Sequence, residues 1–334
     1  MATSCFVLPT LNSSLFLAEC LESLHCTSCD SSAKIPILIL DGGSSDLTLC
    51  IAQEYADRYK RVQVIRAPSL HPAERLNRLM SDNLYTHIMM CHSDDLYNAK
   101  ARFAVLEELK DSSHLMRGSQ VFYFQSALDS IANLDKKLQV GQQTSHPLTH
   151  QEIFPQLLFW WCFSLNTLTI DVEKVLQNRI RFEHEKYKYC ADWYFSWSLA
   201  KKGLVSNSQI ITTLTRHNNR GDGPTNLINL EKEKSQIRSE ILNQSGIKSI
   251  LSSHETSALL SVNYSYGNVR PPYSKASIFR SLLQKLSKHE SSQSISSPDY
   301  RDIFKSIARQ SSSFHLATKR VKSFAISRAR LLYK

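Results

Sequence analysis

The segment IPILILDGGSSD, residues 35–46, joins an almost wholly apolar run to a polar turn of glycine, serine and aspartate. An apolar run of this length is typical of a central strand covered on both faces, and the glycines mark its end. The same alternation fills the first 110 residues: strands are predicted at 5–8, 35–40, 62–65 and 87–91, and helices at 14–24, 47–58, 72–83 and 99–110. This order predicts βα units on a mostly parallel sheet flanked by helices.

Length and composition indicate a folded protein with one large core and an appendage, because 334 residues exceed what a single core usually organises. The hydrophobic fraction of 42% and the charged fraction of 21% are close to globular averages. No stretch approaches the roughly 18 apolar residues of a membrane-spanning helix, and the start MATSCFVLP lacks the features of a secretory signal. The eight cysteines form no regular disulfide framework, so we expect a cytoplasmic protein with reduced thiols.

The excess positive charge lies at the end of the chain. Residues 271–334 contain 13 lysines and arginines against 3 acidic residues, whereas the rest is balanced at 27 against 27. A basic segment with short amphipathic pieces can bind an anionic membrane surface, and no nucleic-acid recognition motif accompanies the charge. We therefore expect peripheral attachment to the inner face of a membrane, and no specific nucleic acid as a partner.

Three polar clusters follow strands of the predicted sheet. They are residues 9–12 after the first strand, 41–46 after the second and 93–95 after the fourth. Ligands collect outside the carboxyl ends of parallel strands, because loops and helix N-termini converge there. We therefore expect the three clusters to surround one ligand site.

In this order the clusters resemble the donor half of family 2 glycosyltransferases. The matching residues are FVLPTLN at 6–12, LILDGGSSD at 38–46, Asn77 and SDD at 93–95. The resemblance covers about residues 4–110 and extends to about residue 220. It implies an α/β fold of the GT-A (Rossmann-like) type. It also implies transfer of a sugar from a UDP-, GDP- or dTDP-sugar to an acceptor hydroxyl, with inversion at the anomeric carbon.

The resemblance also implies how the chain is divided. We expect a GT-A domain over residues 1–230, with a donor nucleotide-binding half at 1–110 and an acceptor-side half at 111–230. Residues 231–334 are then a basic, serine-rich and partly helical C-terminal extension. By analogy with the family, the expected acceptor is a polysaccharide or a lipid-linked glycan.

The resemblance assigns the donor nucleotide to seven positions: Pro9, Thr10, Asn12, Asp41, Gly42, Asn77 and Asp94. An ionised carboxylate such as Asp41 only accepts hydrogen bonds, which suits a base N–H or a ribose hydroxyl. A glycine beside it allows the backbone to approach the ligand closely. The alternative is an ordinary βα turn in which Asp46 caps the following helix.

The sequence Ser93-Asp94-Asp95 resembles the metal-binding acidic motif of GT-A enzymes, commonly Asp-any-Asp, with Ser93 in its first position. The resemblance makes Asp95 a ligand of Mn²⁺ or Mg²⁺, with Asp94 beside the ribose or beside that ligand. Such hard cations prefer oxygen ligands, and donor phosphates complete the site. His217 lies where some members of the family place a histidine near the diphosphate, so it is a second candidate metal ligand. A solvated acidic turn and a loop connector are the respective alternatives.

The segment YCADWY, residues 189–194, followed by KKG at 201–203, resembles the helix that carries the catalytic base of the family. The resemblance makes Asp192 the base that removes the proton of the acceptor hydroxyl. The alternative is a helix N-cap, and both can hold, because a cap position fixes a carboxylate well.

Two other functions compete with sugar transfer. A nucleotidyltransferase also uses an α/β sheet and a metal-bound diphosphate, but residues 9–14 contain neither the glycine nor the lysine of its usual first loop. A catalytically inactive GT-A-like binding protein would keep the fold without the activity. The observation in its favour is Ser93 in the acidic motif.

Overall fold

The computed structural model describes residues 4–26, 35–68, 70–124, 142–144, 153, 157, 164–202, 205–216 and 224–244. Its first part contains β1 (Ser4–Thr10), α1 (Leu17–Cys26), β2 (Ile37–Asp41), α2 (Thr48–Arg58), β3 (Val62–Arg66), α3 (Pro72–Ser81), β4 (His87–Met90), β5 (Leu96–Tyr97) and α4 (Ala99–Lys110). The later elements are β6 (Met116–Phe124), β7 (Gln142–Thr144), the short helix η3 (Leu165–Thr167), β8 (Thr169–Asp171), α7 (Val172–Gln177), α8 (Ala191–Ala200), β9 (Val205–Arg216) and α9 (Pro224–Gln244). None of the helices in the described ranges is long and apolar enough to cross a membrane.

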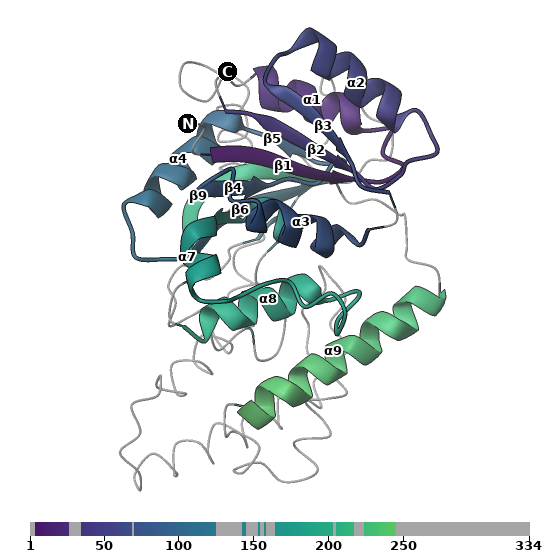
Figure 1. Ribbon diagram of the computed structural model, residues 1–334. Coiled ribbons are helices and arrows are strands. Elements are labelled where there is room, and N and C mark those ends of the chain that lie inside the picture. The colour runs from purple at the N-terminus through teal and green to yellow at the C-terminus, as the bar shows by residue number, and fades with distance from the viewer. Residues whose placement is uncertain are drawn as a thin grey trace, which may run out of the picture.

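The strands form one sheet in the order β3-β2-β1-β4-β8-β6-β9-β5, and β7 pairs with β6 (Figure 1). Neighbouring strands from β3 to β4 are parallel, so their carboxyl ends lie at one edge. β8 joins β4 and β6 in antiparallel fashion, while β6 and β9 are parallel again. The predicted α/β fold, a mostly parallel sheet flanked by helices, is confirmed.

Alternation along the central strands divides the core between the two faces of the sheet. Phe6 and Leu8 of β1 pack in one hydrophobic cluster with α1 and α2, whereas Cys5 and Val7 pack in another with α3, α7 and α8. In Figure 1, α1 and α2 lie on one side of the sheet and α3, α7 and α8 on the other. Because successive side chains of a strand point to opposite faces, a strand covered on both faces has to be apolar almost throughout.

Local side chains fix where the helices begin. The N-cap position of α2 is Leu47 rather than the predicted Asp46, but Asp46 Oδ1 accepts a hydrogen bond from the Thr48 N–H at 3.0 Å directly at the start of the helix. Pro72 occupies the first turn of α3, where its missing N–H costs no hydrogen bond. Asn98 accepts a bond from the Ala101 N–H at 2.8 Å, and α4 begins directly after it.

The strand β9 is a long element that the sequence pattern did not indicate. Its buried residues include several with polar side chains: Ser206, Asn207, Ser208, Thr212 and Thr213. These side chains break the apolar alternation by which strands are recognised. The strand conformation is instead set by pairing, because β9 lies parallel to β6 and antiparallel to β5.

The helix α9 runs through residue 230, where the sequence analysis divides the chain. Ile237, Ile241 and Leu242 in its second half are buried in the same hydrophobic cluster as α8. In Figure 1, α9 lies next to α8 on the side away from the sheet. The expected division at residue 230 therefore falls inside a helix that packs on the core, and residues from 245 onward lie outside the described ranges.

Candidate active site

Short polar side chains tie together the loops after β1, β2 and β4. The side-chain oxygen of Asn12 accepts a hydrogen bond from the Ser45 N–H at 2.9 Å, and the Asn12 N–H donates to Ser44 Oγ at 3.0 Å. Ser93 Oγ donates to Ser13 Oγ at 2.7 Å. The three polar clusters therefore share one rim of the sheet, which we call the donor rim.

The loop after β2 is built around Asp41, whose side chain is fully buried. Its carboxylate accepts hydrogen bonds from the Gly43 N–H at 3.0 Å and from the Ser44 hydroxyl at 2.5 Å. These bonds close the turn, as expected if residues 41–46 form an ordinary βα turn. Asp41 therefore supports the backbone of the donor rim from a buried position.

Arg75 of α3 lies under the same turn and is 4% exposed. Its guanidinium donates to the carbonyl oxygens of Thr10, at 3.3 Å, and of Leu40. A Cβ atom on Gly42 would lie 3.0 Å from Arg75 Nη2, so a larger residue there would displace the guanidinium. Burial lowers the pKa of Arg75, and the nearby Asp41 charge opposes that shift. The packing of Arg75 therefore leaves little room for a side chain at Gly42.

Asp46 joins the first two loops as well as binding the first N–H group of α2. Its Oδ2 accepts a hydrogen bond from the Ser14 N–H at 3.1 Å, in addition to the Thr48 bond on Oδ1. Burial acts to raise the pKa of Asp46, but the hydrogen bonds from Ser14 and Thr48 outweigh it and hold the pKa well below its usual range. The carboxylate therefore stays ionised and keeps the two loops at a fixed spacing.

Asp95, the predicted metal ligand, is the buried member of the acidic motif and is 1% exposed. Its Oδ1 accepts a hydrogen bond from the Arg216 N–H at 2.8 Å, and its Oδ2 accepts one from the Asn166 amide. Burial and the charge of the adjacent Asp94 raise the pKa of Asp95. These bonds connect the segment after β4 to η3 and β9, so Asp95 attaches the second half of the sheet to the donor rim.

His92, Asp94 and Asp95 form a group whose possible metal-ligating atoms all lie within 4.8 Å of one another. The His92 side chain is 41% exposed and Asp94 is partly exposed, so both reach solvent at the donor rim. Ser93 points instead to Ser13 and is not part of the group. His92 is not among the residues predicted from the sequence. Its place directly before the acidic motif could have indicated it, because residues 92–95 form one turn in which the Asp95 N–H binds the His92 carbonyl oxygen at 3.4 Å.

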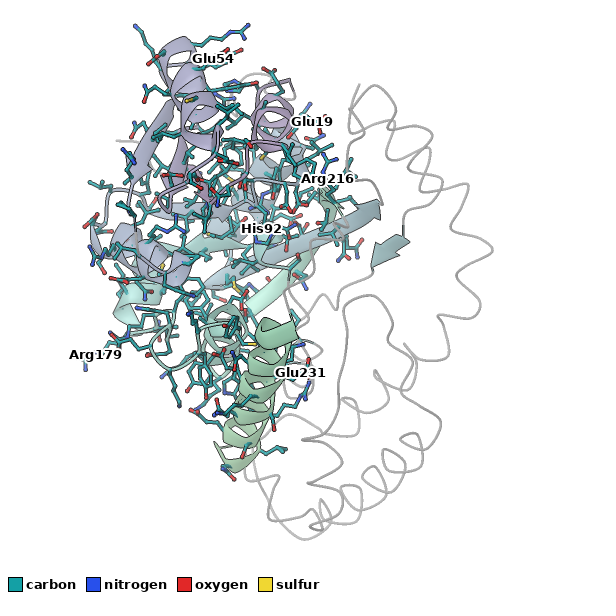
Figure 2. The ribbon with its side chains drawn as sticks, turned by 90° about the vertical axis from the view of Figure 1, so that its right-hand side faces the viewer. Glu19, Glu54, His92, Arg179, Arg216 and Glu231 are labelled. Carbon is teal, nitrogen blue, oxygen red and sulfur yellow. The ribbon has the colours of Figure 1, made fainter. Side chains whose placement is uncertain are left out.

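Arg216 at the end of β9 anchors the backbone of the acidic motif to α1. Its Nε donates to the Asp94 carbonyl oxygen at 3.0 Å, and its Nη2 contacts Glu19 Oε2 at 2.7 Å. The guanidinium also lies 4.5 Å from the centre of the Phe16 ring. Figure 2 shows Glu19, His92 and Arg216 on one flank of the molecule.

A second set of contacts attaches the segment before α8 to α3. His71 Nε2, at the start of α3, hydrogen-bonds with the Lys188 carbonyl oxygen at 2.8 Å. The Asn77 amide donates to the Phe182 carbonyl oxygen at 2.8 Å and accepts from the Phe182 N–H at 2.9 Å. Both polar groups of Asn77 therefore bind the protein backbone, which places Asn77 among the residues that position α8.

Asp192 lies in the first turn of α8 and is partly exposed, whereas the N-cap position itself is Cys190. Its Oδ1 accepts a hydrogen bond from the Trp193 N–H at 2.8 Å. Burial raises the pKa of Asp192 to about 7 against the effect of its hydrogen bonds, and the charge of Glu233 adds to the rise. A carboxyl group with a pKa near neutrality can accept a proton at physiological pH, as a general base must.

The predicted site residues thus fall into three sets. Those at the donor rim or directly beneath it are Pro9, Thr10, Asn12, Asp41, Gly42, Asp94 and Asp95. Asn77 and Asp192 belong to the contacts around α3 and α8. His217 follows the end of β9 and lies outside the described residues.

Comparisons with known proteins concern the fold and the first half of the chain. Residues 5–155 match the family model described as glycosyl transferase family 2. The chain is similar to TarS 1–349 of S. aureus, with 16% identity, a TM-score of 0.53 and 92% of each chain covered. The same TarS fragment in complex with UDP-GlcNAc aligns with 15% identity, a TM-score of 0.50 and again 92% of each chain.

A third solved structure is the mannosyltransferase PcManGT from Pyrobaculum calidifontis, in complex with GDP-Man and Mn²⁺. It aligns with 12% identity and a TM-score of 0.51, over 99% of this chain and 86% of that chain. At these identities the likeness concerns the fold. A sequence search of curated proteins gives no match.

Proposed function

We propose, from the match of residues 5–155 to the family model described as glycosyl transferase family 2, that the protein transfers a hexose from a nucleotide-diphosphate sugar to an acceptor hydroxyl, with inversion and with the help of a divalent metal. The observation that carries the proposal is the donor rim, where Asn12 and Ser13 join the loops of three parallel strands beside the His92 group. Solved structures of this fold in complex with UDP-GlcNAc and with GDP-Man support a nucleotide-sugar as the ligand.

The donor nucleotide would lie along the donor rim. Pro9, Asn12 and Gly42 are accessible there, at least in part, while Thr10 and Asp41 form the buried support beneath them. Asp94, partly exposed beside His92, is placed to meet the ribose or the diphosphate. Asn77 is left out of the proposed donor site, because its amide binds Phe182.

The ligand set of the His92 group fits a divalent metal ion. Carboxylates suit Mn²⁺ and Mg²⁺, whereas imidazole is a ligand of transition metals, so the presence of His92 favours Mn²⁺. His92 and Asp94 would hold the ion with Asp95 behind them, and His217 stays a prediction from the sequence. When bound, the metal would neutralise the charge that develops on the departing diphosphate.

Asp192 is the proposed base. Its carboxylate would take the proton of the acceptor hydroxyl as the hydroxyl oxygen forms a bond to the anomeric carbon of the sugar. The bond from that carbon to the diphosphate oxygen breaks, and its electron pair leaves with the nucleoside diphosphate. Attack on the face opposite the leaving group inverts the anomeric carbon. The pKa of about 7 suits this task, because the group is ionised in part at neutral pH and still basic enough to accept a proton.

A thermal-shift screen with UDP-, GDP- and dTDP-sugars, each with Mn²⁺, with Mg²⁺ and without metal, tests the donor. Binding to the native state raises the melting temperature, and we expect the largest rise for one nucleotide with Mn²⁺. Proton NMR of the product then reads the anomeric configuration. A retained configuration would refute inversion, and binding without transfer or donor hydrolysis would support the inactive binding protein instead.

For the acceptor, we propose a polysaccharide or a lipid-linked glycan at an anionic membrane surface. The support is the charge of residues 271–334, with 13 basic residues against 3 acidic ones. Co-sedimentation with vesicles of phosphatidylglycerol and phosphatidylcholine tests it. We expect the full chain to sediment at low salt and a chain ending at residue 270 to remain in the supernatant. Equal sedimentation of both would contradict the proposal.

A further inference from the structure

The turn that leads into α8 is held by a carboxylate from another helix. Glu233 of α9 accepts hydrogen bonds from three consecutive backbone N–H groups: Lys188 at 2.8 Å, Tyr189 at 2.6 Å and Cys190 at 3.0 Å. The N-cap residue Cys190 makes no side-chain capping bond of its own. A carboxylate at the start of a helix is also favoured by the helix dipole. Glu233 therefore accepts the hydrogen bonds at the start of α8 that the Cys190 side chain does not accept.

The rest of α9 fastens the same region. Glu240 accepts hydrogen bonds from the hydroxyls of Tyr187, at 2.5 Å, and Tyr194, at 2.6 Å, and it also pairs with Lys186. The Arg238 guanidinium lies 5.5 Å from the centre of the Trp193 ring. Because these contacts flank the turn on both sides, α9 cannot shift without moving the start of α8.

Asp192 is the second residue after this turn. Its Oδ1 accepts the Trp193 N–H, while Glu233 occupies the N–H groups of residues 188–190. Two carboxylates from different helices thus share the N–H groups at one helix start. The position of Asp192 then depends on where Glu233 holds the turn.

We propose that Glu233 is a positioning residue for Asp192: it binds the turn at residues 188–190 and thereby sets the place and the ionisation of the base in sugar transfer. This inference rests on the proposed function, since it takes Asp192 as the base. Charge supports it as well as geometry. After burial, the Glu233 carboxylate is the charged group that raises the pKa of Asp192, and the Cys190 thiol is the other titratable group beside it.

The test compares Glu233→Gln and Glu233→Ala with a control on the same helix, Glu231→Gln. Glu231 forms its ion pair with Lys234 at 2.7 Å and is labelled on α9 in Figure 2, well away from His92. Each protein is assayed for kcat against pH, for KM of the donor and for binding of the nucleoside diphosphate with Mn²⁺. Hydrogen exchange of the amides of residues 188–190 is measured in parallel.

For Glu233→Gln we expect the acid limb of the profile of kcat against pH to move to lower pH, because removing a negative charge lowers the pKa of Asp192. For Glu233→Ala we expect a loss of kcat of about 10²-fold, the scale of a misplaced catalytic group, with nucleotide binding unchanged. Exchange at residues 188–190 should become faster in the alanine variant. The control should match the wild type in all four measurements.

Two results would separate the hypotheses. If the wild type transfers sugar but both Glu233 variants keep its acid limb and its kcat, the positioning role is wrong while the proposed function stands. A purely structural role would lower the melting temperature and the active fraction but leave the acid limb in place, which also overturns the inference. If the wild type transfers no sugar from any donor, the proposed function fails and the positioning role falls with it. The exchange data then still decide whether Glu233 holds the turn.

Discussion

The donor rim and the start of α8 hold their functional side chains in different ways. At the donor rim, neighbouring loops bind each other through short side chains such as Asn12 and Ser13, close behind strands that the core fixes. At the start of α8 the turn is bound by Glu233, which lies more than 40 positions further along the chain. The donor rim is therefore part of the core fold, whereas the position of Asp192, the proposed base, depends on the docking of a single outer helix.

The largest expected effect tests whether the two regions have separate tasks. Asp192→Asn should lower kcat between about 10²- and 10⁴-fold, the range for losing a general base, and leave the dissociation constant of the nucleoside diphosphate unchanged. Kinetics and calorimetric titration measure the two quantities. In the wild type, kcat should rise with pH through about 7, since the base acts only when ionised. A weakened nucleotide affinity in the variant would place Asp192 in the donor site instead.

A second substitution probes the donor rim alone. Asp94→Ala removes a proposed metal ligand. The affinity for Mn²⁺ should therefore fall at least about 10- to 100-fold, which is the loss seen when a residue that merely hydrogen-bonds to a metal ligand is replaced. Nucleotide binding without metal should change much less. Calorimetric titration of Mn²⁺ in the presence of nucleoside diphosphate measures this, with Glu54→Gln, on the exposed side of α2, as the control. Unchanged affinity would remove Asp94 from the proposed metal site.

The adjacent Asp95 should behave differently from Asp94, because it attaches the second half of the sheet to the donor rim. Asp95→Ala removes the oxygen atoms that accept from Arg216 and Asn166, so we expect a loss of about 2 kcal/mol in the free energy of unfolding. For Asp94→Ala the change should stay within about 0.5 kcal/mol. Urea denaturation measures both, and equal losses would contradict the division of roles.

The smallest effect concerns the stability of α8. The pKa of Asp192 is raised from 3.8 to about 7 in the folded protein. Its contribution to stability is therefore fully present below pH 3.8 and is lost as the pH rises through 7. At pH 8 the variant Asp192→Asn, which has no charge to bury, should be more stable than the wild type. At pH 4 the difference should vanish, and a difference of the same size at both pH values would refute the shifted pKa.

Much of the first half could be predicted from the sequence. The short apolar run at residues 35–40, bounded by glycines, indicated a strand, and the apolar periodicity of residues 99–110 indicated a helix; α4 has the predicted bounds. The hydrogen bond from the Thr48 N–H to Asp46 is equally local, because it joins residues two positions apart. What local patterns could not indicate was β9, whose buried serines and threonines are accommodated only because β5 and β6 pair with it.

The candidate site likewise has one part that the sequence predicted and another that it did not. Sequence order alone indicated that residues 9–12, 41–46 and 93–95 would meet, because the ends of parallel strands lie at one edge. Whether a carboxylate in these clusters faces a ligand or the protein was decided by tertiary contacts: Asp41 turns inward to its own loop, and Asp95 turns to Arg216 and Asn166.

By itself the sequence determined the order of strands and helices in the donor half and the rim at which its polar loops gather, since both follow from short-range periodicity and from the geometry of parallel strands. Only the tertiary structure brought Arg216 and Asn166 to Asp95 and Glu233 to the turn before Asp192. The physical reason is that hydrogen bonds and charges between distant segments depend on how helices pack, which no local pattern of residues records.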